Sequence, residues 1–423
     1  MSTKPVLAIT MGDPAGIGPE VIVGAWRDDR IHEQAQLFVV GHPEILRRAA
    51  RMLGCDLTVV EIESPGSLRQ ASSSADTLPC IKVCSDDVLD VPPGHVDARA
   101  GEAAYQAVRL AAEMAVAKQV DGIVTAPLSK AALHAAGHRY PGHTELLAEI
   151  CGARNFAMML YLSREREAES GERGARSEEQ SVESGYRGVG GAKRRVRSGD
   201  TGSGSADVDV LRTRYSVRNA ETAGEAVRSS DAAVSPKTDL HPAPSIPHPA
   251  SSLGVVHVTL HQALRSVFAD LTPEAIESKC RLADGAMRRL GIAEPRIGVC
   301  ALNPHAGEDG LFGDEEQTII RPAVEAALRA GIDVSGPFPA DTLMMRARDG
   351  EFDAVVAMYH DQGHIALKLL GMHSAVNITL GLPIVRTSVA HGTAFDRAWQ
   401  GTARCDGMVA AIGTAARLAK SLS

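Results

Sequence analysis

Residues 355–396 constrain the fold of this 423-residue chain most strongly. The stretch opens with the apolar run VVAM, which predicts a short buried strand that ends at Tyr359, His360 and Asp361. Further polar residues follow from the next helix, strands and turns: Lys368, Asn377, Arg386, Thr387, His391 and Thr393. In open α/β sheets, ligands bind at the carboxyl ends of strands. The stretch therefore predicts a metal-assisted site for a small anionic substrate, with solvated loop residues as the alternative.

Strand-like and helix-like segments alternate along the rest of the chain. Apolar runs predict strands at residues 5–10, 37–41, 122–127, 156–162, 253–261 and 296–303. Helical spacing marks residues 43–53, 98–118, 273–290, 315–330 and 402–422. The segment 63–93 is rich in Ser and Pro, which predicts irregular structure. Because strands alternate with helices, the chain is predicted to form parallel, doubly wound sheets.

Composition narrows the class of protein. A formal net charge of -8 argues against general nucleic-acid binding, which needs a clustered basic face. No apolar run approaches the roughly 20 residues of a membrane span, and the N-terminus lacks the pattern of a signal peptide. The seven cysteines lack paired zinc-like spacing, which predicts a reduced, cytoplasmic protein.

Residues 163–252 differ from the rest of the chain. Ser, Gly, Arg, Glu and Ala dominate this segment, and large apolar residues are sparse. Such a composition cannot bury a core of its own. The segment is predicted to be a disordered or weakly ordered insertion that leaves from a surface loop, where added length costs little.

Two turns are candidates for binding an anion. MGDPAGIGPE, at residues 11–20, places glycines before a helix predicted to start near Pro19. YPGHTELLAE places His143 and Thr144 at the start of another helix, which either residue could cap. Helix N-termini attract phosphate and carboxylate groups. The structural alternatives are a tight strand–helix turn in the first case and a capped helix with an exposed histidine in the second.

Three histidines share one sequence context. His261, His305 and His360 each follow an apolar strand and precede a turn or helix. Three imidazoles with one open position make a catalytic divalent-metal site. Asp341 or Asp361 could add an oxygen ligand or orient a histidine. The alternative is that each histidine only makes structural hydrogen bonds.

Lys368 lies eight residues after His360, about two helical turns, so both can face the same cleft. A lysine in this position could carry a proton or hold an anionic group of a substrate. Asn377 and the planar fork of Arg386 would complete an anion pocket. The alternative for Lys368 is a solvated residue on the helix surface.

Together, these motifs resemble the 4-hydroxythreonine-4-phosphate dehydrogenase family of vitamin B6 (pyridoxine) biosynthesis. The resemblance rests on MGDPAGIGPE, TAPLSK, GHTELLAE, NPHAGEDG, PADT, AMYHDQGHIALK and VNITLGLPIVRTSVAHGTAFD. It implies an α/β, two-domain fold like that of isocitrate and isopropylmalate dehydrogenases. Residues 1–128 with 388–423 would form one domain, and residues 129–387 the other, with the metal site. The active site would lie in the cleft between the domains, at a homodimer interface.

The resemblance also implies roles for individual residues. One divalent metal per subunit (zinc, magnesium or cobalt) would bind His261, His305 and His360. Substrate contacts would fall on His143, Thr144, Lys368, Asn377 and Arg386. Lys368 and Asp341 would be catalytic. NAD or NADP would accept the hydride, and no residue of the sequence is assigned to its binding.

The implied reaction is oxidation of 4-phosphohydroxy-L-threonine to 2-amino-3-oxo-4-phosphooxybutanoate, which loses carbon dioxide to give 3-amino-2-oxopropyl phosphate. Relatives that act on D-threonate or D-erythronate 4-phosphate, or on aromatic dihydrodiols, are alternatives. A non-catalytic, ligand-binding relative is a remote alternative. Neither a nucleic acid nor a membrane is expected as a partner.

Overall fold

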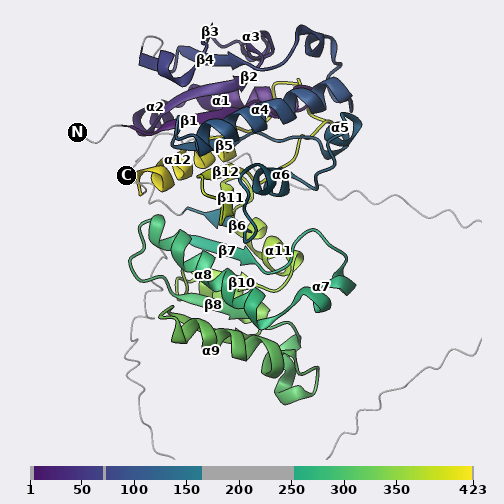
Figure 1. Cartoon of the computed structure of the whole chain (residues 1–423), viewed down its shortest axis with the longest axis vertical. Helices are drawn as coiled ribbons and strands as arrows, with labels where there is room; N and C mark the ends of the chain where they lie inside the picture. The colour runs from purple at the N-terminus through teal and green to yellow at the C-terminus, as the bar shows by residue number, and fades with distance from the viewer. Residues whose placement is uncertain (1–3, 70–72, 164–251, 422–423) are drawn as a thin grey trace, which may run out of the picture. The chain divides into compact units, whose positions relative to one another are not determined.

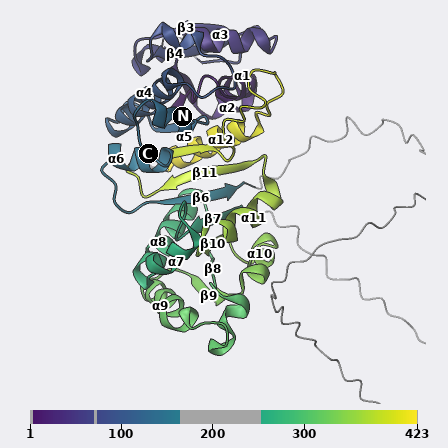
Figure 2. The ribbon, with the colours of Figure 1, turned by 90° about the vertical axis from the view of Figure 1, so that its right-hand side faces the viewer.

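A single sheet organises the part of the chain that the computed structural model describes, which is residues 4–69, 73–163 and 252–421. Twelve strands form this sheet in the order β3-β4-β2-β1-β5-β12-β11-β6-β7-β10-β8-β9. All described residues belong to one compact unit. The predicted insertion at residues 163–252 lies outside the described residues, apart from its two end residues. Figures 1 and 2 show the sheet with helices on its faces.

The first part of the sheet is parallel. Its strands are β1 (Val6–Thr10), β2 (Gln36–Gly41), β3 (Thr58–Glu61), β4 (Thr77–Lys82) and β5 (Gly122–Thr125). Strand β1 pairs with β2 and β5, and β4 pairs with β2 and β3. The helices of this part are α1 (Gly18–Trp26), α2 (Asp29–Gln34), α3 (Pro43–Met52), α4 (Ala98–Val116), α5 (Lys130–Ala135) and α6 (His143–Ile150). Short 3-10 helices lie at Pro65–Arg69 and Asp86–Asp90.

The centre of the sheet is antiparallel, which corrects the prediction of purely parallel sheets. Strand β11 (Ala375–Leu380) runs antiparallel to both β12 (Arg386–Val389) and β6 (Ala157–Leu162). Strand β6 in turn runs antiparallel to β7 (Leu253–His257). Leu162 and Leu253 are paired directly, so the chain leaves and re-enters the sheet at neighbouring positions. A short hairpin turn could join such strands, and residues 163–252 occupy its place in the sequence.

The remaining strands are again parallel. Strand β10 (Ala354–Ala357) pairs with β7 and with β8 (Ile297–Cys300), and β8 pairs with β9 (Val334–Phe338). The helices are α7 (Leu264–Asp270), α8 (Pro273–Arg289), α9 (Arg321–Arg329), α10 (Ala340–Arg348), α11 (His360–Gly371) and α12 (Asp406–Lys420). A 3-10 segment at Pro304–Gly310 and a π-helical turn at Glu316–Ile320 precede α9.

Burial explains why continuous apolar runs became strands. All four residues of β10 are buried, as are all residues of β6 and β7. Strands covered on both faces read as uninterrupted apolar runs, because no side chain faces water. Segment 63–93 was predicted to be irregular, and this was wrong for β4, which carries the run LPCI between polar ends.

The division into two domains at residues 128–129 and 387–388 stays a prediction. Among the described residues, no helix is long and apolar enough to cross a membrane. The cytoplasmic location stays a prediction as well.

Candidate active site

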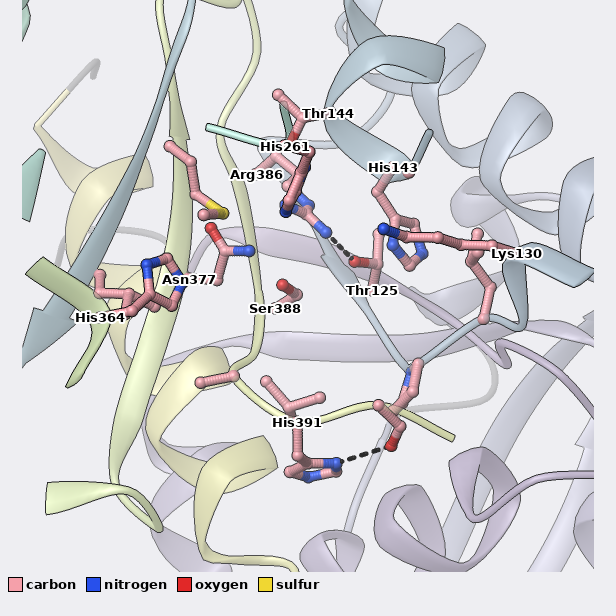
Figure 3. A pocket seen from close by; sticks show the side chains of 18 of the residues that line it. Thr125, Lys130, His143, Thr144, His261, His364, Asn377, Arg386, Ser388 and His391 are labelled. Atoms are coloured by element: carbon pink, nitrogen blue, oxygen red, sulfur yellow. Dashed lines mark hydrogen bonds between the residues drawn. The ribbon is translucent and has the colours of Figure 1, made fainter. Parts of the chain in front are cut away.

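A pocket of about 390 Å³ lies at the carboxyl ends of the central strands. Figure 3 shows that side chains from β5, β11, β12, α6 and α11 face this space. Eight of the residues that the sequence singled out line it: His143, Thr144, His261, His360, Lys368, Asn377, Arg386 and His391. Residues separated by more than 200 positions in the sequence therefore meet at one sheet edge, as the rule for strand ends predicts.

Arg386 is the buried charge of this pocket. Its side chain donates hydrogen bonds to the hydroxyls of Thr379 (2.9 Å) and Thr125 (2.7 Å), while its Nε has no partner. Burial lowers the pKa of Arg386 to about 9, and nearby Glu145 opposes that shift. Among the described residues, no carboxylate lies within ion-pair distance of Arg386. A buried guanidinium held only by hydroxyls is costly unless an anion joins it.

The start of α6 supplies further polar atoms without partners. The N-cap of this helix is Gly142, so the prediction that His143 or Thr144 caps the helix was wrong. Instead, both side chains line the pocket. His143 Nε2 and Asn377 Oδ1 are buried without hydrogen-bond partners. Burial, with Arg386 and Lys130 close by, lowers the pKa of His143 well below its usual value, so this imidazole is neutral. Buried polar atoms normally have partners, so these mark a place for a ligand.

His261 and His360 lie together at one end of the pocket. Their ring centroids are 5.8 Å apart. Asp361 Oδ1 lies 2.6 Å from His360 Nδ1, and Glu145 Oε1 lies 3.9 Å from His261 Nδ1. A carboxylate at Nδ1 orients an imidazole and leaves Nε2 free to bind a metal. The position of Asp361 is compatible with the orienting role that the sequence suggested, which stays a prediction.

His305 and Asp341 do not line this pocket. The side chain of His305 is 70% exposed, and its Nδ1 lies 3.2 Å from Glu308 Oε2. Asp341 is exposed in the first turn of α10 and accepts a hydrogen bond from the backbone N–H of Thr342. Among the described residues, no three His, Cys, Asp or Glu side chains cluster as a metal site. One chain therefore brings together two of the three predicted histidines, and the predicted roles stay predictions.

Some pocket residues escaped sequence reasoning. These are Thr125, Lys130, Glu145, His364 and Ser388. For His364 a signal was available, because it follows His360 by four residues and must share its face of a helix. Thr387 was named instead of its neighbour Ser388, yet its hydroxyl donates to the carbonyl of Ala411, away from the pocket. Alternation along β12 explains that difference.

His364 belongs to a pair of buried histidines behind the pocket. Its Nδ1 lies 3.0 Å from Nε2 of His257, which is fully buried at the end of β7. Burial lowers the pKa of His257 to about 3 and that of His364 to about 2, so both rings are neutral. The ring of His364 also stacks on that of His360, with centroids 3.8 Å apart and an interplanar angle of 14°.

The glycine-rich turn at residues 11–20 packs against the protein and lines no part of the pocket. At Gly12, φ is +73° and an added Cβ would lie 2.3 Å from the carbonyl oxygen of Pro127. The backbone N–H of Ile17 donates to Thr393 O, and Glu20 accepts from the backbone N–H groups of Trp399 and Gly401. The segment makes a tight turn, and its direct contact with a ligand stays a prediction.

Comparison with known proteins identifies the family. The model of the family described as pyridoxal phosphate biosynthetic protein PdxA matches residues 33–166 and 245–415. The chain belongs to the PdxA family. It is 37% identical to D-threonate 4-phosphate dehydrogenase of Pectobacterium atrosepticum, over 98% of this chain and 99% of that protein. It is 36% identical to 4-hydroxythreonine-4-phosphate dehydrogenase of Trichlorobacter lovleyi, over 98% of each chain.

A solved structure extends the likeness to the fold. The 4-hydroxythreonine-4-phosphate dehydrogenase of Klebsiella pneumoniae matches with a TM-score of 0.70 and 36% identity, covering 98% of this chain and 100% of that one. The predicted family, fold class and dehydrogenase class are confirmed. A PdxA-family dehydrogenase implies a nicotinamide cofactor and a divalent metal. Which nicotinamide and which metal this chain takes belong to the proposal below.

Proposed function

We propose that this chain oxidises the C3 hydroxyl of a four-carbon, 4-phosphorylated hydroxy acid. The C3–H hydride passes to NAD or NADP, the hydroxyl loses a proton, and the resulting β-keto acid releases carbon dioxide. The observation that carries this proposal is Arg386, a buried guanidinium with no carboxylate partner among the described residues, in the same pocket as two histidines whose Nδ1 atoms face carboxylates. Such a pocket suits a substrate with an anionic end and an alcohol that must be activated.

The phosphate would bind at the Arg386 end of the pocket. Arg386 Nε has no hydrogen-bond partner among the described residues, and Thr144 lines the same pocket. Charge-assisted hydrogen bonds from a guanidinium to phosphate are among the strongest in proteins. Lys130 and Lys368 form no ion pair with a described residue, so both add positive charge to the pocket.

The His261 and His360 end would hold the metal. A zinc, magnesium or cobalt ion bound there acts as a Lewis acid that favours loss of the hydroxyl proton and polarises a ketone. Glu145 and Asp361, which lie at the two Nδ1 atoms, would leave each Nε2 available to hold the ion. Lys368, two helical turns from His360 on α11, would carry the proton away from the C3 hydroxyl.

A homodimer would complete this site. The described residues expose large apolar side chains on α7 and α11 or directly after α11: Leu264, Phe268, Ile365, Leu369, Leu370 and Met372. Helix α7 starts three residues after His261, and α11 starts at His360. Apolar faces next to the metal histidines suit an interface between two copies of the chain. The third histidine and the acid at PADT would then be the partner subunit's His305 and the partner subunit's Asp341.

The backbone around His305 also favours a partner. Four non-glycine residues there have φ between 45° and 57°: His305, Ala306, Glu308 and Asp309. Such left-handed conformations cost free energy and persist where surrounding contacts enforce them. Within one chain, His305 is exposed. Contacts from a second copy would supply what one chain lacks.

Two substrates are candidates, because the relatives named for each are almost equally similar to this chain. The first is 4-phosphohydroxy-L-threonine, with an ammonium group at C2, and the second is D-threonate 4-phosphate, with a hydroxyl at C2. The test is NADH or NADPH formation by metal-loaded protein with each of these, and with D-erythronate 4-phosphate. Turnover of at least one supports the proposal. A protein that binds metal and nicotinamide but oxidises none of the three would overturn it.

A further inference from the structure

Helix α11 presents three polar side chains to the pocket in one line. His360, His364 and Lys368 are spaced by four residues, which places them on one face of the helix. His360 belongs to the pair of histidines at one end, and Lys368 lies one turn beyond His364. A side chain between these two faces the middle of any molecule that reaches from the histidine pair to the lysine. Figure 3 shows His364 among the residues around the central space.

His257 leaves His364 only one nitrogen for the pocket. The hydrogen bond of 3.0 Å between His364 Nδ1 and His257 Nε2 occupies Nδ1. This contact depends on close packing of α11 on β7, because a Cβ at Gly363 would lie 2.5 Å from His257 Nε2. Two neutral imidazoles joined in this way have linked tautomers. His364 Nε2 is the nitrogen left for the pocket, as an acceptor when His364 Nδ1 donates to His257 and as a donor when His257 donates, and no described residue is bonded to it.

The stacking geometry argues against His364 as a ligand of the same metal as His360. The two rings are almost parallel, at 14°, with centroids 3.8 Å apart. The lone pair of an imidazole nitrogen lies in the plane of its ring, so lone pairs of two stacked rings do not converge on one tetrahedral ion. His364 supports the face of His360 and keeps its own Nε2 for another partner.

We propose that His364 Nε2 hydrogen-bonds to the C2 substituent of the substrate, and that His257 positions it to do so. This proposal rests on the proposed function, in which C3 is oxidised at the histidines and the phosphate on C4 binds at Arg386, so that C2 and the carboxylate extend from C3 along α11 toward Lys368. The substituent on C2 is the group that differs between a 2-amino acid and a 2-hydroxy acid. His364 would thus be a specificity residue of this pocket, and His257 a positioning residue.

Three substitutions of His364 distinguish the role of its Nδ1 from that of its Nε2. His364→Leu removes both, His364→Asn places an amide near Nδ1, and His364→Gln places one near Nε2. If Nε2 contacts the substrate, His364→Leu lowers kcat/KM about 10-fold, as expected for loss of one hydrogen bond. His364→Gln should then recover most of that loss and His364→Asn little of it. Recovery by His364→Asn alone would show that only the bond to His257 matters, and would overturn the proposal.

A second experiment uses a substrate that lacks the C2 substituent. The compound is 3-hydroxy-4-(phosphonooxy)butanoate, which keeps the reacting alcohol, the carboxylate and the phosphate. The wild-type protein and His364→Leu should use it with kcat/KM values within about 2-fold of each other, because there is no contact left to lose. An equal 10-fold loss on this compound would assign His364 a purely structural role. The wild-type protein alone also tests the contact, because it should use this compound with a kcat/KM about 10-fold below that of its substrate whether or not a variant folds.

His32→Leu is the matched control, because His32 is a half-buried histidine on α2 outside the pocket. Its kcat/KM should stay at the wild-type value on every compound. A wild-type protein that oxidises none of the substrates would count against the proposed function. Normal turnover without discrimination at C2 would count against His364 alone.

Discussion

Two groups of predicted site residues have the same sequence context but end in different places. His261 and His360 follow β7 and β10 and line the pocket. His305 and Asp341 follow β8 and β9, the next strands of the same sheet, and both are exposed outside it. The rule for strand ends led us to expect the three histidines at one sheet edge. It does not say whether a loop at that edge points into its own pocket or toward another copy of the chain.

The difference therefore separates two kinds of site residue. Those of the first group serve the pocket of their own chain, together with Arg386 and Lys368. In the proposed dimer, those of the second group serve the pocket of the partner subunit. The following predictions test which residues belong to the pocket of their own chain and which belong to the partner subunit's pocket.

The largest effect is expected from mixing two inactive variants. His305→Ala and His360→Ala should each lose bound metal and lower activity about 1,000-fold or more, while keeping the fold. In a mixed dimer, one pocket lacks both histidines and the other lacks neither. Random reassociation of equal amounts should restore about a quarter of wild-type activity.

The control for that experiment is a mixture of His261→Ala and His360→Ala. Both residues belong to the same pocket, so each pocket of the mixed dimer lacks one of them and activity should not return. Recovery of activity in the control mixture would contradict the assignment of the three histidines to own-chain and partner-chain positions. So would the absence of recovery in the mixture of His305→Ala and His360→Ala.

A charge placed on the apolar face should have the next largest effect. Leu369 on α11 is 83% exposed within one chain, and Leu369→Glu would bury a carboxylate at the proposed interface. We expect a monomer by sedimentation and about 100-fold lower activity, with unfolding unchanged because Leu369 packs little in one chain. Leu328→Glu on α9, where the leucine is also exposed, is the matched control and should stay dimeric and active. An active Leu369→Glu monomer would contradict a shared site.

Sequence reasoning identified the pocket residues that one chain supplies, but it did not identify the hydrogen bonds that they make. Apolar runs fixed most strands, and polar residues after them identified His261, His360 and Arg386, because strand ends converge whatever lies between them. The sequence does not show that Arg386 is bonded only to Thr125 and Thr379, since those partners come from other strands.

Other features depended on tertiary contacts. The antiparallel pairing of β11 with its neighbours could not be predicted, because a short apolar run has no direction. His257 was hidden inside a strand, and only the packing of α11 at Gly363 brings it to His364. The turn containing Gly12 resembled a ligand loop, but its glycine serves a close approach to Pro127.

Arg386→Met tests the part of the site that one chain supplies alone. Removing the guanidinium should raise KM for a phosphorylated substrate about 50-fold, through loss of charge-assisted hydrogen bonds. Dimerisation should not change and metal content should change little, since the hydrogen bonds of Arg386 go to Thr125 and Thr379 and not to the histidines. Arg281→Met, at an exposed arginine paired with Glu277 on α8, should leave KM unchanged. A metal loss in Arg386→Met would mean that the two ends of the pocket are not independent.

The smallest effect is expected from the carboxylate at His360. Asp361 Oδ1 lies 2.6 Å from His360 Nδ1, so Asp361→Asn keeps the shape of the side chain but removes its charge. Carboxylates in this position typically change metal affinity by 10- to 100-fold. Because Asp361 is itself 69% exposed and solvent weakens its charge, we expect the lower end, about 10-fold in metal Kd. Asp284→Asn, at a carboxylate on α8 paired with Arg288, is the control and should not change the metal Kd. An Asp361→Asn protein with wild-type metal Kd would show that Asp361 does not orient His360 as a metal ligand.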